Sequence, residues 1–414
     1  MSAWKPRILA WGLGLFLAAC SEDTARPPSG QSPPPESATL AARIGNSNAF
    51  AFDLYGHLRA TEGNLIVSPH SIVTDFGMVY AGARGETERQ IAEVLRFNYP
   101  PAGFHSILKQ LNDLLESRGS AADPDSFRLH IACSAWGRHD FTYVSAFLDT
   151  LAVNYGANLR LVDFVGQPEA ARVAINQWVA DETENLIQNL IAPGQIDALT
   201  VLVLANAMYF RASWLNQFDP FFTSPASFTR LDGSTVTVPI MAAQLPVRYH
   251  QGNGFRAVAM PYEGEECSML LLLPDAGTFE SFEASLTPAV VDSIVRAFPE
   301  HAGDVIVHLP RFSFDTRFDL DDALKAMGMT DAFEPGADFS GITPGGGIWI
   351  SFVAHKAFIA VNEYGTLAAA GTATGFTLGI LPEFYAVRPF IFVIRDDATG
   401  TILFLGRVLD PSVN

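Results

Sequence analysis

The spacing of apolar residues changes about half-way along the chain. In the first half, apolar positions recur every three to four residues, as on one face of a helix. This pattern predicts helices at about 41–59, 69–83, 86–96, 102–117, 142–155 and 168–190. Ser68 and Pro69 mark the start of the second helix, because the hydroxyl can cap a free amide and proline suits the first turn.

The second half of the chain has mostly the pattern of strands. Val201–Phe210 is apolar except for Asn206 and indicates a buried strand. Residues 348–362 alternate between apolar and polar, while 388–395 and 401–408 indicate a hairpin. A run of helices followed by a run of strands is typical of an α+β fold.

Residues 364–382 carry no charge and are rich in Ala, Gly and Thr, although they connect two predicted strands. Such small side chains cannot build a core, and a long surface loop is normally kept soluble by charge. From the residues alone, a flexible linker is favoured over a functional loop. A loop of this composition can nevertheless become a strand.

Length and composition allow one large core. The chain has 414 residues, of which 49% are hydrophobic, and such a length usually indicates two domains. After residue 40, however, only Thr343–Gly347 resembles a linker, and no repeat occurs at a fixed period. We therefore expect a single α+β domain over residues 40–414.

The amino terminus indicates export and a lipid anchor. Lys5 and Arg7 precede a short apolar stretch, so residues 1–19 are typical of a signal peptide. The stretch ends in Leu-Ala-Ala-Cys20, which resembles a bacterial lipoprotein cleavage box. Residues 20–39 would then be a lipidated cysteine and a Pro/Ser-rich tether. We expect an outer-membrane or cell-surface location, with a plain secreted protein as the alternative.

Charge limits the partners. The formal net charge is −18, and it becomes −20 if Lys5 and Arg7 leave with the signal peptide. A chain this acidic repels nucleic acids and anionic lipid surfaces, so neither nucleic acid nor a polyanionic cofactor is expected. Apart from Cys20, the chain has two cysteines, Cys133 and Cys267. They are interpreted as packed thiols, since a disulfide needs the fold to bring them together.

The motifs of common enzyme classes are missing from the sequence. It contains no His-Glu-x-x-His, no Gly-x-Ser-x-Gly, no phosphate-binding Gly-x-x-x-x-Gly-Lys, and no Cys/His pairs at zinc spacing. We therefore expect no catalytic residues, no metal and no cofactor. An enzyme is the least favoured of the functions considered.

A series of ordered strings along the chain resembles those of a known family. The string Val361-Asn-Glu-Tyr-Gly-Thr-Leu-Ala-Ala-Ala-Gly-Thr372, preceded by His355-Lys-Ala, is similar to the hinge of the serpin family. Further matches are Asn64–Ile72, Gly82–Leu95, Leu204–Trp214, Met260–Gly264, Leu309–Phe312 and Asp338–Gly341. The resemblance covers roughly residues 40 to 410. It implies a monomer with three β-sheets, about eight or nine helices and an exposed reactive-centre loop.

The resemblance also assigns two groups of residues. The hinge, which inserts into the central sheet, comprises Glu363, Gly365, Thr366, Ala368, Ala369 and Ala370. The shutter cluster, which holds the strands of that sheet together, comprises Ser68, Ser71, Asn206 and His355. Serpins often carry a basic partner for the hinge glutamate after a Pro-Met-Met string, but here Ala242 follows Val238-Pro-Ile-Met241, which leaves Glu363 without that partner.

The activity implied by the resemblance is suicide inhibition of serine proteases, possibly also of a cysteine protease. The bait bond is Leu378–Gly379 or Gly379–Ile380, depending on the end from which the loop is counted. No Lys or Arg lies between Ala357 and Val387, which favours chymotrypsin-, elastase- or subtilisin-like targets over trypsin-like ones. The main alternative is a non-inhibitory serpin that binds a partner or is merely cleaved.

Overall fold

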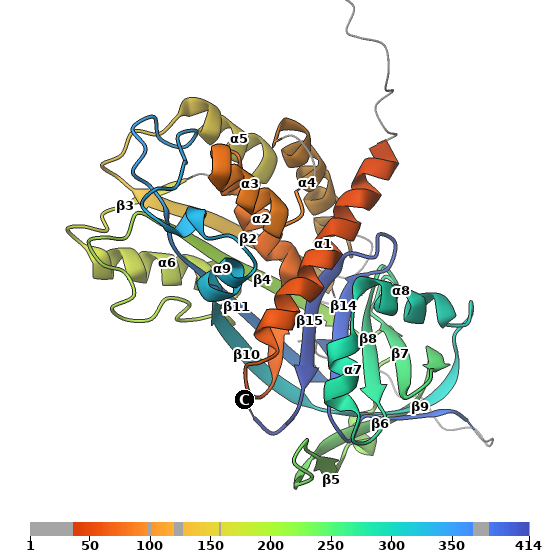
Figure 1. Ribbon diagram of the computed structural model, residues 1–414. Helices are drawn as coiled ribbons and strands as arrows, with labels where there is room; N and C mark the ends of the chain where they lie inside the picture. Colours follow the sequence, from red (N-terminus) through yellow and green to blue (C-terminus); the bar gives the residue numbers. More distant parts are fainter. Residues whose placement is uncertain (1–35, 98–100, 120–126, 157–158, 367–380, 414) are drawn as a thin grey trace, which may run out of the picture. The chain divides into compact units, whose positions relative to one another are not determined.

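The structure is a computed structural model that describes residues 36–97, 101–119, 127–156, 159–366 and 381–413. Helices occupy most of the described residues up to Glu182, and strands are the main regular structure of the described residues after it (Figure 1). The α-helices of the described residues are α1 (Glu36–Leu58), α2 (Pro69–Tyr80), α3 (Gly85–Val94), α4 (Pro101–Glu116), α5 (Ser145–Tyr155), α6 (Pro168–Glu182), α7 (Phe279–Ser285), α8 (Pro288–Ala297) and α9 (Asp321–Ala326). Two short 3₁₀ turns are η1 (Pro220–Phe222) and η2 (Asp331–Phe333).

The strands of the described residues form two hydrogen-bonded networks. A six-stranded sheet has the order β10 (Phe312–Asp319), β11 (Ile350–Asn362), β12 (Gly365–Thr366), β4 (Leu202–Ser213), β2 (Phe127–Arg138) and β3 (Arg160–Val162). A nine-stranded sheet has the order β1 (Leu65–Val67), β15 (Ile402–Val408), β14 (Phe390–Asp396), β8 (Cys267–Pro274), β7 (Phe255–Pro261), β6 (Thr235–Gln251), β9 (Gly303–Pro310) and β13 (Glu383–Tyr385), with β5 (Ser224–Thr229) also on β6.

Three sheets were expected, and two of them are joined through one strand into the nine-stranded network. The long strand β6 pairs with β5 and β9 along its first part and with β7 along its last four residues. It thereby joins two sheets into one nine-stranded network. The α+β fold and the helices of the first half are confirmed.

Two details of the helices differ from the expectation. The predicted helix 168–190 ends at Glu182, because Glu184 and Asn185 have positive φ values of 50° and 64° that close the turn. Helix α2 does begin at Pro69, but the Ser68 hydroxyl caps no amide there. It faces the thioether of Met208, at 2.8 Å from the sulfur.

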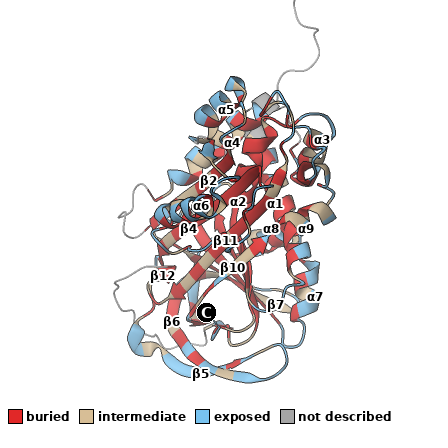
Figure 2. Cartoon of the chain, turned by 90° about the vertical axis from the view of Figure 1, so that its left-hand side faces the viewer, coloured by how far each residue is buried: buried red, intermediate tan, exposed pale blue. Residues whose placement is uncertain are grey.

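The core has layers on both sides of the six-stranded sheet. Along β4, Leu202 and Leu204 pack with α2, whereas Val203 and Ala205 pack with α6. Successive strand residues point to opposite faces, so α2 and α6 cover the two faces of the same strand. Figure 2 shows the buried centre of this sheet, with an exposed outer face on α6. A third cluster lies between the two sheets, around Phe210 and Phe392.

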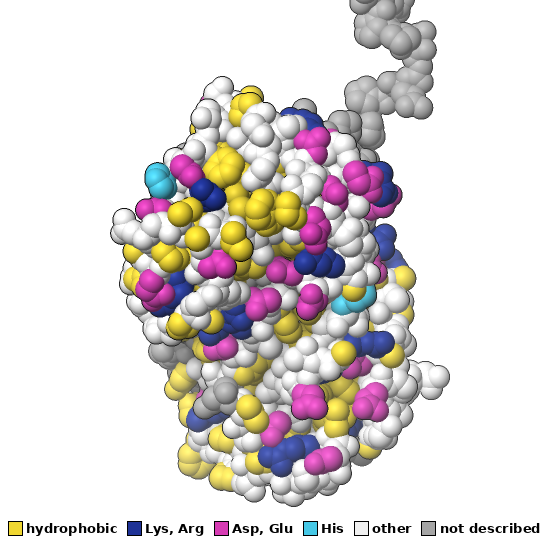
Figure 3. Space-filling model, turned by 60° about the vertical axis from the view of Figure 1, so that its left-hand side comes forward, with side chains coloured by type: hydrophobic (Ala, Val, Ile, Leu, Met, Phe, Trp, Pro, Cys, Tyr) yellow, Lys and Arg dark blue, Asp and Glu magenta, His cyan; other side chains and the backbone are white. Residues whose placement is uncertain are grey.

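Charged side chains of both signs are intermingled on the face drawn in Figure 3. Several charged side chains of the described residues are paired locally, such as Arg89 with Glu86 and Lys109 with Asp113. Exposed pairs of this kind stabilise the protein only slightly. Within the described residues, no helix is long and apolar enough to cross a membrane.

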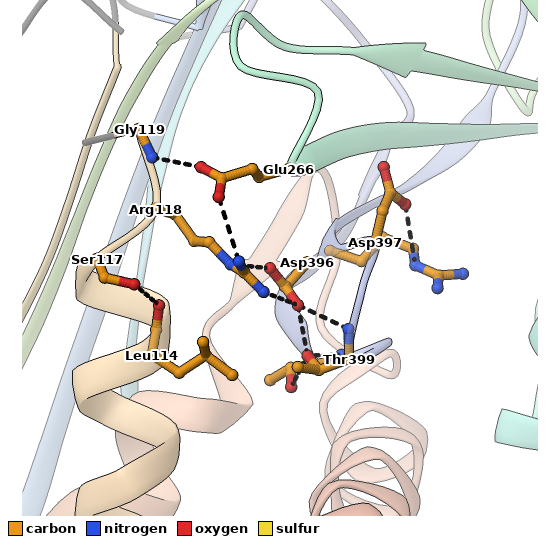
Figure 4. Close-up of polar contacts among 10 residues, drawn as sticks. Leu114, Ser117, Arg118, Gly119, Glu266, Asp396, Asp397 and Thr399 are labelled. Carbon is orange, nitrogen blue, oxygen red and sulfur yellow. Dashed lines mark hydrogen bonds and ion pairs between the residues drawn. The ribbon is translucent and has the colours of Figure 1, made fainter. Parts of the chain in front are cut away.

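A buried ionic cluster fastens the end of α4 to the nine-stranded sheet (Figure 4). The Arg118 guanidinium donates to Asp396 through Nε at 2.6 Å and to Glu266 through Nη1 at 3.2 Å. Glu266 also accepts from the Gly119 amide, and Asp396, wholly buried, accepts from Thr399. The cluster therefore fixes α4 relative to the turns after β7 and β14.

Candidate functional site

The strand β12 lies between β4 and β11 at one end of the six-stranded sheet. Its Thr366 pairs with Val361 of β11 and with Ala212 of β4, antiparallel to both. Gly365 pairs in the same way with Asn362 and Ser213. Two residues at the start of the uncharged stretch are thus already inserted as a strand.

Gly365 is required by this insertion. Its φ of +153° is a conformation that residues with a side chain rarely adopt. A Cβ placed there would also lie 2.1 Å from the carbonyl oxygen of Ala212 and 2.6 Å from the Cα of Ser213. Only glycine lets the hinge pass this close to β4.

Below β12, β4 and β11 meet directly along a seam. They pair in parallel from Ile350–Leu202 to Lys356–Ala207. Between that pairing and β12, residues 208–211 of β4 and 357–360 of β11 have no partner from each other among the described pairings. An extension of β12 would first fill this interval and would then have to separate the parallel pairs.

Glu363 anchors the hinge immediately before β12. Its carboxylate is almost fully buried and pairs with Arg311, whose Nη2 lies 2.5 Å from Oε1. Thr223 donates a further hydrogen bond to the same carboxylate. Burial alone would raise the pKa of Glu363, but the hydrogen bonds from Arg311 and Thr223 lower it below its usual value.

The basic partner of Glu363 therefore exists, but not at the position where the sequence analysis sought it. Ala242 lies on β6 and supplies no charge. Arg311 follows β9 directly and belongs to the matched string Leu309–Phe312. Arg311 could be located in the sequence through this string, but its ion pair with Glu363 became evident only from the fold.

Two aromatic residues support the inserted hinge, and the sequence analysis gave neither of them a role. The Tyr262 hydroxyl lies 2.8 Å from the Thr366 hydroxyl, and both residues are buried. The Trp214 indole stacks on Tyr262 with ring centroids 4.7 Å apart and donates to the Asn362 carbonyl. Both aromatic residues lie inside strings that match the family, and this was the sequence feature by which their role could have been predicted.

The shutter cluster lies at the seam, and the structure brings all four of its residues together. The Asn206 Oδ1 atom lies 2.7 Å from the Ser71 hydroxyl and 3.0 Å from His355 Nδ1. His355 Nε2 in turn accepts from the Ser68 amide at 3.2 Å. Asn206 and His355 are direct register partners on β4 and β11. Separating these strands would break this contact.

All four shutter residues are fully buried. Burial lowers the pKa of His355 to about 3, so the ring is neutral near pH 7 and its Nε2 can accept a hydrogen bond from the Ser68 amide. Buried polar groups are costly unless paired, which favours one discrete arrangement.

Asp75 adds an unexpected carboxyl group beside the shutter cluster. It lies on α2, whose twelve residues are all buried, and neither of its oxygens has a well-aligned hydrogen bond within the described residues. Burial raises its pKa well above the usual range, and the neighbouring Cys133 and Asn206 lower it only in part. Cys133 and Cys267 are free thiols, as interpreted from the sequence.

Several predicted residues lie outside the described part of the chain. These are the hinge residues Ala368, Ala369 and Ala370, the bait residues Leu378, Gly379 and Ile380, and the lipidation site Cys20. Of the hinge, the structure places Glu363, Gly365 and Thr366 at the end of the seam.

The chain re-enters the nine-stranded sheet after the uncharged stretch. Here β13 pairs in parallel with β9, and the Tyr385 ring stacks on His308 at 3.8 Å between centroids. The Thr229 amide at the end of β5 donates to the Val387 carbonyl at 2.9 Å. Residues 367–380 therefore connect two fixed ends in two different sheets.

Comparisons with known proteins agree with this geometry. The family model described as "Serpin (serine protease inhibitor)" matches residues 45–411. The leukocyte elastase inhibitor of Sus scrofa is 37% identical and covers 87% of this chain and 97% of its own length. An uncharacterized serpin-like protein of Thermococcus kodakarensis is 36% identical, covering 88% and 84%.

The fold also matches solved structures. Thyroxine-binding globulin in complex with thyroxine superposes with a TM-score of 0.80 at 29% identity, over 89% of this chain and 99% of that one. A family model that matches nearly the whole domain, together with relatives of this identity and coverage, leaves one conclusion. The chain belongs to the serpin family.

Proposed function

We propose that the protein is a suicide inhibitor of serine proteases. A protease would attack a bond in residues 367–380 and form an acyl-enzyme, and the freed hinge would then extend β12 down the seam. Dragging the acyl bond away from the oxyanion hole and the hydrolytic water traps the intermediate, since both must be held to within about an ångström. No step requires a catalytic residue of this chain.

One observation supports the proposal: the hinge is already inserted at Gly365–Thr366, next to an interval in which β4 and β11 do not pair with each other among the described residues. The following residues 367–372 are Leu, Ala, Ala, Ala, Gly and Thr, all uncharged and mostly small. Small side chains can enter a packed sheet without clashes. Sequence and geometry therefore favour the same movement.

The proposed target has an apolar specificity pocket. Leu378 is the better primary residue, because its side chain can fill such a pocket and glycine at 379 cannot. The name of the porcine relative, an elastase inhibitor, supports a target of this class. Chymotrypsin-, elastase- and subtilisin-like proteases fit, with cleavage at Leu378–Gly379 or Gly379–Ile380.

A non-inhibitory serpin is the second candidate. Thyroxine-binding globulin shares the fold and carries a hormone in its solved complex. Gly371 and the uncharged Tyr364 and Leu367 also depart from the family's usual hinge. A protein of this kind would be cleaved without trapping the protease.

We also propose that the domain is tethered to a membrane through acyl chains on Cys20. The Leu-Ala-Ala-Cys box after an apolar stretch supports this, and more than one acyl chain gives stable anchoring. Growth with a radiolabelled fatty acid should label the wild type but not Cys20→Ser. Equal labelling of both would contradict the anchor.

Loop insertion itself can be tested apart from inhibition. Cleavage of residues 367–380 by thermolysin should allow about a dozen new backbone hydrogen bonds at about 1 kcal/mol each. For a domain of this size, that stabilisation raises Tm by on the order of 10 °C. Calorimetry of the intact and cleaved protein measures it. An unchanged or lower Tm after cleavage would show that the hinge does not insert.

A further inference from the structure

Phe221 exposes a large apolar surface next to the hinge. Its side chain is 85% exposed, more than any other large apolar side chain of the described residues. A single exposed apolar residue needs no explanation by itself. The rigidity of the turn that carries it and the position of that turn give it significance.

Hydrogen bonds hold the backbone of the turn η1, and Phe221 makes one ring contact. The Phe221 amide donates to the Asp219 carboxylate at 2.9 Å, and the Thr223 amide donates to the Pro220 carbonyl at 3.2 Å. The neighbouring Phe222 ring meets Phe221 edge to face, with centroids 5.3 Å apart. A pre-organised aromatic group loses little conformational entropy when a partner covers it.

The position of η1 relates it to both ends of the reactive loop. Thr223, which closes the turn, donates to the carboxylate of Glu363, two residues before Gly365. At the other end of β5, Thr229 bonds to Val387 beyond the loop. The segment that carries Phe221 thus connects the two points between which residues 367–380 are held.

We propose that Phe221 is a second contact for the target protease, received by an apolar depression beside its active-site cleft. This rests on the proposed function. The fourteen residues 367–380 span at most about 50 Å when fully extended, so a protease bound to them stays within reach of η1. Aromatic residues, Phe among them, are enriched at the cores of protein interfaces relative to the rest of the surface.

The test compares Phe221→Ala and Phe221→Leu with the wild type, using pancreatic elastase and chymotrypsin. Phe221→Ala should lower the second-order rate constant of inhibition about five- to tenfold, with Phe221→Leu in between. The number of inhibitor molecules consumed per trapped protease should stay unchanged, because the hinge is intact. Leu199→Ala is the matched control, since Leu199 is 74% exposed but precedes β4 at the end opposite the hinge.

Three outcomes would overturn the contact. Equal rate constants for Phe221→Ala and wild type would exclude it, and so would an equal loss in Leu199→Ala. A changed stoichiometry at an unchanged rate would show that Phe221 acts on the hinge instead. If the wild type itself traps no protease, the proposed function fails first and the contact fails with it.

Discussion

At the scale of single residues, buried polar groups hold β4 and β11 together at the seam, and each has few possible hydrogen-bond partners. Asn206 serves Ser71 and His355 at once, so its carbonyl oxygen joins α2, β4 and β11. Glu363 is satisfied by Arg311 and Thr223. Asp75 is the exception, because its buried carboxyl group has no partner of comparable quality in the described chain.

Asp75 should make stability depend on pH. Because its pKa is raised in the folded state, its contribution is fully present below the unfolded pKa of about 4 and is lost as the pH rises toward the folded pKa. Asp75→Asn should have the same free energy of unfolding as the wild type near pH 4 and a larger one above pH 4. The difference between the two should grow by at most about 1.4 kcal/mol per pH unit. Urea unfolding of both proteins at pH 4, 6 and 8 measures this difference.

The exposed Asp113, paired with Lys109 on α4, is the control for this series. Asp113→Asn should show no such growing difference. If the free energies of unfolding of Asp75→Asn and the wild type differ by the same amount at all three pH values, ionisation of Asp75 does not destabilise the folded protein.

At the scale of elements, the proposed inhibition depends on how easily β12 lengthens. Thr366→Arg places a charged side chain where the hinge is buried against Tyr262. Burial of an unpaired charge in the sheet is costly, so insertion should stall and the variant should become a substrate. Gel analysis should show cleaved protein and loss of trapped protease. Thr366→Ser, which keeps the hydroxyl, should still trap; equal trapping by the Arg variant would contradict insertion at this residue.

The Arg118 cluster of Figure 4 fastens another element, α4, to the nine-stranded sheet. Arg118→Ala would leave the carboxylate of Asp396 buried without its cation. Loss of one partner of a buried pair typically costs about 3–5 kcal/mol. Arg128→Ala removes an exposed pair with Glu184 and should change stability little. Equal unfolding midpoints for both variants would show that the cluster does not hold α4.

The elements themselves could largely be predicted from the sequence, but the contacts between them could not. Periodicity located α1 to α5 closely, yet it could not see the positive φ values that end α6. The pairing of Arg118 with Asp396 joins residues 278 positions apart. Asp75 sits in an otherwise well-patterned helix, and only the fold shows that its carboxyl group is buried.

At the scale of the whole molecule, we infer that the native state is arranged to insert residues 367–380 after cleavage. Among the described residues, β4 and β11 do not pair with each other just below Thr366, and a polar cluster holds them together further down. Sixteen residues, 367–382, join Thr366 to β13. In the proposed mechanism, cleavage would remove the constraint that keeps β12 short. The chain could then adopt a more stable arrangement with a longer β12, and an attached protease would move with it.

The most direct test of this account is to mix the domain with chymotrypsin, elastase, subtilisin and trypsin and to analyse the products after boiling in detergent. The account predicts a covalent complex with at least one of the first three, and a released peptide that begins at Gly379 or Ile380. It predicts no complex with trypsin, since no Lys or Arg lies in residues 358–386. Clean cleavage by all of them, with no covalent complex, would contradict suicide inhibition.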